Sequence, residues 1–125
     1  MKKISVLFIA LLILISLSAC GRASFNGSRT GNDSQLIMDY KIFNTTEEQF
    51  LTLEQGDTLD VQVVSNSGKL DIAVGIEEET PIYTGEDVPT SSFKLEISQE
   101  GIYKVSVTGH KAKGSVSIIK EDKTN

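Results

Sequence analysis

Hydrophobic and polar residues alternate along most of the chain beyond residue 35. A two-residue period of this kind predicts β-strands that place one face against a core and the other in water. Strands are therefore expected near residues 35–43, 47–53, 59–63, 70–76, 93–97, 102–107 and 115–120. After Cys20 no apolar stripe with helical spacing is long enough to predict a helix.

Polar and glycine-containing segments separate these strands and predict the turns between them. Residues 66–68 (Asn-Ser-Gly) lie between two clearly alternating stretches, which is typical of a β-hairpin. Residues 54–57 and 98–101 also have turn composition, whereas residues 85–92 and 109–114 are expected to form loops.

About seven or eight short strands with regularly spaced turns favour an all-β fold. We predict a two-layer antiparallel β-sandwich, jelly-roll-like, in which the apolar positions of the strands form one core. The expected core residues are Leu59, Val61, Val63, Leu70, Ile72, Val74, Phe93, Leu95, Ile97, Tyr103, Val105, Val107, Val116 and Ile118.

The start of the chain has the pattern of a secretory signal peptide. Lys2 and Lys3 precede an uncharged run over residues 4–19, and small residues come just before the only cysteine, Cys20. A helix that spans the hydrocarbon core needs about 20 apolar residues, so this run is short for a permanent anchor. A signal-peptide helix that is later removed is the better interpretation.

The last four residues of this segment, Leu17, Ser18, Ala19 and Cys20, resemble the lipobox of bacterial lipoproteins. This resemblance implies that diacylglycerol is attached to the Cys20 thiol and that cleavage leaves Cys20 as the new N-terminus. We expect no cofactor besides this covalent lipid. Two acyl chains suffice for stable membrane attachment. The alternative is an ordinary signal peptide with an unrelated cysteine. The expected location is the extracytoplasmic face of the cell membrane.

The domain organisation follows from these signals. Residues 1–19 are the expected signal peptide, 20–34 the lipidated cysteine and a flexible Gly/Ser/Asn-rich tether, 35–120 the β-sandwich and 121–125 a polar tail. With Cys20 lipidated, the mature domain has no thiol left for disulfides, redox chemistry, nucleophilic catalysis or metal binding.

Charge narrows the expected partners. Removing Lys2 and Lys3 lowers the basic residues from 12 to 10 against 17 acidic ones, a formal charge of −7. Nucleic acid and anionic headgroups both require a basic surface, so a net negative domain is a poor candidate for either. The expected contacts are the membrane, through the lipid anchor, and an unknown envelope or extracellular protein or a glycan.

Five segments also resemble the small jelly-roll sandwiches of exported bacterial proteins, of the pre-peptidase C-terminal type, and short lipoproteins of Gram-positive bacteria. They are G-D-T-L-D-V-Q-V (56–63), G-K-L-D-I-A-V (68–74), F-K-L-E-I (93–97), G-I-Y-K-V-S-V-T-G (101–109) and G-S-V-S-I (114–118). The matching positions are turn glycines and core residues, so the resemblance implies a fold and transfers no functional residue. By analogy, such sandwiches serve as accessory or binding modules.

Few side chains are candidates for chemistry. His110 is the sole histidine, is expected in an exposed loop, and has no G-x-S-x-G nucleophile signal near it. The acidic residues Glu77, Glu78 and Glu79, or Asp57, Asp60 and Asp71, could supply calcium ligands or a glycosidase carboxylate pair, yet they match no EF-hand loop. We therefore expect no metal site and no enzyme.

Aromatic residues leave one candidate for stacking on a sugar. The chain has no Trp, and Phe50, Phe93 and Tyr103 fall at expected core positions. Tyr83, between Pro81 and Pro89, is the remaining platform. The leading hypothesis is a lipid-anchored, non-enzymatic binding module of the envelope with an unknown ligand; the alternative is a carbohydrate-binding jelly roll.

Overall fold

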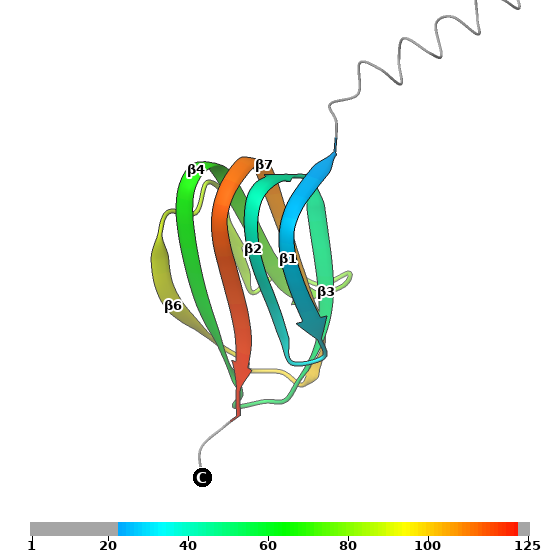
Figure 1. Cartoon of the computed structure of the whole chain (residues 1–125). Helices are drawn as coiled ribbons and strands as arrows, with labels where there is room; N and C mark the ends of the chain where they lie inside the picture. The colour runs from blue at the N-terminus through cyan, green and yellow to red at the C-terminus, as the bar shows by residue number, and fades with distance from the viewer. Residues whose placement is uncertain (1–22, 123–125) are drawn as a thin grey trace, which may run out of the picture.

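A computed structural model describes residues 23–122, which form seven antiparallel strands (Figure 1). Within this range no helix is long and apolar enough to cross a membrane. The expected signal peptide and lipobox lie outside the described residues. The strands are β1 (Ser24–Asn32), β2 (Gln35–Asn44), β3 (Thr46–Leu53), β4 (Thr58–Ile76), β5 (Tyr83–Gly85), β6 (Ser91–Glu96) and β7 (Gly101–Glu121).

Two long strands, β4 and β7, form the centre of the fold. They pair antiparallel over their whole length, from Thr58 opposite Glu121 to Ile76 opposite Tyr103. Halfway along, both strands bend and pass from one layer into the other (Figure 1). The first layer has the order β1, β2, β7, β4, β6 and uses residues 112–119 of β7; the second has the order β3, β7, β4, β5 and uses residues 101–108. The predicted all-β antiparallel sandwich is confirmed.

The bend in β4 and β7 lies where the sequence predicted a turn at 66–68 and a loop at 109–114. The pairing of β4 with β7 shifts register on both sides of Ser67, and Gly68, Lys111 and Gly114 have positive φ values of 71°, 52° and 147°. These are β-bulges, which bend and twist a strand without ending it. The predicted hairpin turn at 66–68 and the predicted loop at 109–114 are therefore wrong. Glycine and polar residues mark a bulge and a turn alike, because both require unusual backbone angles.

Much of the segment predicted to be a flexible tether, residues 20–34, is a β-strand in the structure. Nine of its residues form β1, which pairs with β2 along its length. Most of β1 is exposed, and it is held by Phe25, whose ring packs edge-on against Phe43 at 5.6 Å, and by the Arg29 ion pair with Glu47 at 2.7 Å. The folded domain thus begins at Ser24 and not at residue 35. Only Phe25 of this edge strand packs against the core, so the sequence of β1 has no alternation of apolar and polar residues from which a strand could be predicted.

The predicted core is largely confirmed. Twelve of the fourteen expected residues are buried, while Phe93 and Leu95 are half-buried and pack against the core. Phe50 was expected in the core and is 47% exposed, because Leu51 and Leu53 of β3 face inward instead. In β2 a register shift after Tyr40 turns Phe43 inward. The other buried hydrophobic residues are Leu36, Met38, Tyr40, Phe43, Leu51, Leu53, Val88 and Ala112.

Candidate functional site

A large hollow lies at the bend of β4 and β7. It is an open groove with a volume of about 620 Å³. The bulged parts of both strands supply one side, and the connection between β5 and β6 supplies the other. The lining residues are Gly68, Lys69, Asp71, Glu86, Asp87, His110 and Lys111.

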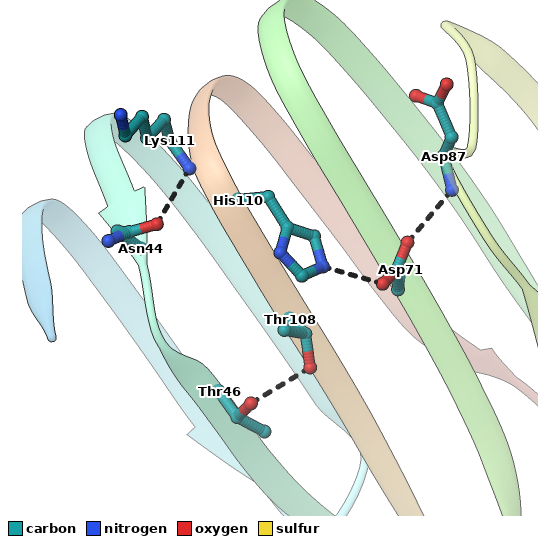
Figure 2. Close-up of polar contacts among 7 residues, drawn as sticks. All are labelled: Asn44, Thr46, Asp71, Asp87, Thr108, His110 and Lys111. Atoms are coloured by element: carbon teal, nitrogen blue, oxygen red, sulfur yellow. Dashed lines mark hydrogen bonds and ion pairs between the residues drawn. The ribbon is translucent and has the colours of Figure 1, made fainter. Parts of the chain in front are cut away.

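An imidazole–carboxylate pair crosses the groove between the two strands (Figure 2). His110 Nε2 lies 2.8 Å from Asp71 Oδ2. The second oxygen, Oδ1, accepts a hydrogen bond of 2.9 Å from the backbone N–H of Asp87. This backbone hydrogen bond, followed by the bond and the charge of His110, lowers the pKa of Asp71, although partial burial works against them. Asp71 is therefore a carboxylate at neutral pH.

Backbone contacts fix the loop that carries Asp87. The N–H of Val88 donates to the Leu70 carbonyl at 2.8 Å, and the Val88 side chain is buried in the core. The hydroxyl of Thr90 accepts from the N–H of Ser65 at 2.9 Å. The loop side of the groove is therefore held to β4 by hydrogen bonds and by the buried Val88 side chain.

Polar contacts continue toward β2 and β3 (Figure 2). The Lys111 N–H donates to Asn44 Oδ1 at 3.0 Å, which supports the positive φ of Lys111. The Thr46 and Thr108 hydroxyls are hydrogen-bonded to each other at 2.9 Å. Over residues 23–122 no hydroxyl is hydrogen-bonded to the His110 imidazole, so the geometry of a serine-type triad is not assembled there. The arrangement suits recognition of a polar or charged ligand.

His110 is exposed, as expected, with 53% of its side chain accessible. It lies in β7 and not in a loop, and it has a fixed partner. That partner is 39 residues earlier in the chain. Asp71 lies in a stretch with strand alternation and His110 closely follows another, and pairing these two stretches would have brought the two residues together. The predicted hairpin turn at 66–68 instead paired residues 70–76 with residues 59–63.

The other candidate residues do not come together. Asp57 is 2% exposed and accepts from the Glu54 N–H at 2.8 Å, which makes it a turn residue. Asp60 and Asp71 lie on opposite sides of the bend in β4. The acidic run 77–79 follows the far end of that strand. Throughout the described range, no three carboxylate, imidazole or thiol groups form a metal-binding cluster.

Tyr83 lies in β5 and is half-buried. Its ring packs against Phe93 with the centroids 5.1 Å apart and a tilt of 41°, and both rings contact the core. A sugar-binding platform needs an aromatic face open to solvent. Tyr83 is only half-buried, so its role as a glycan platform stays a prediction. Cys20 and the rest of the lipobox are outside the described residues.

Comparisons with known proteins gave structural neighbours only. Scans against protein-family models and curated proteins produced no match. The chain is similar to a periplasmic inhibitor of g-type lysozyme from Aeromonas hydrophila, at 14% identity over 79% of this chain and 88% of that one, with a TM-score of 0.47. It is also similar to a CBM4 structure, at 8% identity over 82% and 81% of the two chains, with a TM-score of 0.41.

Proposed function

We propose that this protein is a lipid-anchored, extracytoplasmic β-sandwich that acts as a non-enzymatic binding module. The observation that carries the anchoring is the sequence around Cys20: a charged start, an uncharged run and the four residues Leu17, Ser18, Ala19 and Cys20. A diacylglyceryl group on the thiol would supply the two acyl chains that stable attachment requires.

The fold supports this proposal by starting close to the cysteine. Strand β1 begins at Ser24, four residues after Cys20. Four residues of extended chain reach at most about 14 Å. A lipid on Cys20 would therefore hold the sandwich against the membrane surface, much closer than a tether ending at residue 34 would.

Binding is supported over catalysis by the groove at the bend. Asp71 is held by two hydrogen bonds, and the Thr108 hydroxyl is occupied by Thr46. A His–Asp pair without a positioned nucleophile can still donate and accept hydrogen bonds. The exposed side chains of Lys69 and Lys111 add positive charge to the same groove.

The experiment replaces the thiol and follows the protein in cells grown with labelled fatty acid. Cys20→Ala should release the protein to the medium or leave an uncleaved precursor, and it should carry no label. Ser18→Ala keeps a small residue in the lipobox and is the matched control, which should remain labelled and membrane-bound. A Cys20→Ala protein that keeps the label would refute the anchoring.

A further inference from the structure

Four exposed lysines gather at the bend end of the sandwich. Lys69 lies at the β4 bulge, Lys111 and Lys113 at the β7 bulge, and Lys41 in the neighbouring part of β2. We call these four the bend lysines. All four are exposed, and within residues 23–122 none of them has its ammonium group in an ion pair. The acidic residues at this end are Asp71, Glu86 and Asp87 in the groove, Asp39 beside the β7 bulge, and Glu47, which is paired with Arg29.

The opposite end is strongly acidic. Strands β4 and β7 both begin and end there, together with the ends of β3 and β6. The exposed or half-exposed acidic residues at this end are Glu54, Glu77, Glu78, Glu79, Glu96, Glu100, Glu121 and Asp122. Among residues 23–122, the lysines at this end are Lys94, Lys104 and Lys120, and all three form ion pairs with carboxylates. The net negative charge of the domain is therefore concentrated at one end.

The chain enters the sandwich at the bend end. Ser24 pairs with Asn44, whose side chain accepts from the N–H of Lys111, so the start of β1 lies beside the β7 bulge. Figure 1 shows the start of β1 at the same end as the bends of β4 and β7. A lipid on Cys20, only four residues before Ser24, would hold this end toward the bilayer.

We infer that the bend end is a membrane-docking surface, and that the bend lysines bind the anionic phosphate headgroups of the membrane that holds the anchor. This inference rests on the proposed function, because the short link to Cys20 brings the surface to the lipid. The acidic end then points away from the membrane and is left free for other contacts.

Charge separation explains why the net charge does not prevent this contact. Interactions between exposed charges fall off over about 8 Å at physiological salt, so the distant acidic end contributes little repulsion at the surface. Each lysine near an anionic membrane contributes about a fivefold change in the binding equilibrium. Asp39, Asp71, Glu86 and Asp87 oppose the lysines, but the Asp71 carboxylate already accepts a hydrogen bond from the Asp87 N–H and contacts His110 Nε2, so its oxygens are turned toward these partners.

Lysine footprinting of the full lipidated protein tests the inference. The protein is placed in vesicles of phosphatidylcholine alone or with phosphatidylglycerol, treated briefly with an acetylating reagent, and read by mass spectrometry. The bend lysines should react at least about fivefold more slowly on the anionic vesicles. Lys94, Lys104 and Lys120 should react at the same rate on both. Equal rates for the bend lysines on the two vesicles would overturn the inference.

Two matched variants distinguish docking by the bend lysines from an effect of the total charge of the protein. K111Q/K113Q and K94Q/K120Q remove two positive charges each, from opposite ends. The first should abolish the slower reaction of Lys41 and Lys69 on anionic vesicles, and the second should preserve it. Glycerol 3-phosphate added to phosphatidylcholine vesicles should not slow Lys69 or Lys111; if it does, the groove is a site for small anions and the docking surface is wrong.

Failure of the anchor gives a different result. A protein that carries no lipid will not float with phosphatidylcholine vesicles, which refutes the proposed function and leaves the docking surface to be tested separately. Its free Cys20 thiol can then be coupled to a maleimide phospholipid, and the same footprint is read. Slower reaction of the bend lysines on anionic vesicles supports the docking surface, and unchanged rates overturn it.

Discussion

Gly114 is the residue on which the bend of β7 most depends. Its φ of +147° is rarely adopted by residues with a side chain, and a Cβ at this position would lie 1.9 Å from the Val64 carbonyl oxygen. Forcing alanine into such a conformation costs about 1–3 kcal/mol, before the clash with the β4 backbone is counted. We expect Gly114→Ala to lower the free energy of unfolding by at least about 2 kcal/mol.

Calorimetric melting of the purified domain measures this effect. A loss of about 2 kcal/mol corresponds to a fall in Tm of roughly 8–16 °C for a domain of about 100 residues. Gly101→Ala is the matched control in the same strand, because its Cβ would meet only the flexible end of Ile76, at 2.9 Å. It should change stability by less than about 1 kcal/mol. Equal melting temperatures for the two variants would refute the bend as described.

Three further predictions concern stability. Val105→Asp places a charge at a fully buried position and should abolish the cooperative melting transition, whereas an unchanged melting curve would contradict the core assignment. Phe25→Ala removes the ring packed on Phe43 and should cost about 1–2 kcal/mol in denaturant unfolding, whereas a true tether would show no change. Because the backbone hydrogen bond from Asp87 lowers the pKa of Asp71, its carboxylate stabilises the fold above about pH 4 and loses this effect as the pH falls further. Asp71→Asn should therefore lose less stability than the wild type between about pH 5 and pH 2, and identical acid profiles would refute the contact.

Strand alternation in the sequence was enough to predict the fold class and most of the core. Leu59 to Val63 and Leu70 to Val74 alternate cleanly, and each faces the core as expected. What the pattern could not show is that these two stretches form one strand. The bulges around Ser67 use the same residue types as a turn, so only the pairing with β7 distinguishes them.

The candidate site was harder to predict for the same reason. His110 and Asp71 meet only because β4 and β7 run side by side through the bend. The net charge of the chain was also misleading, since it averages over one end with four unpaired lysines and another end with most of the exposed carboxylates. Exposed lysines at a bulge and carboxylates at strand ends become separate surfaces only when the topology is known.

The intact mass of the protein extracted from native membranes tests the central claim most directly. The account predicts a chain that begins at Cys20, has lost residues 1–19 and carries a diacylglyceryl group on the thiol. A chain with residues 1–19 still attached, or with Cys20 as a free thiol, would contradict it.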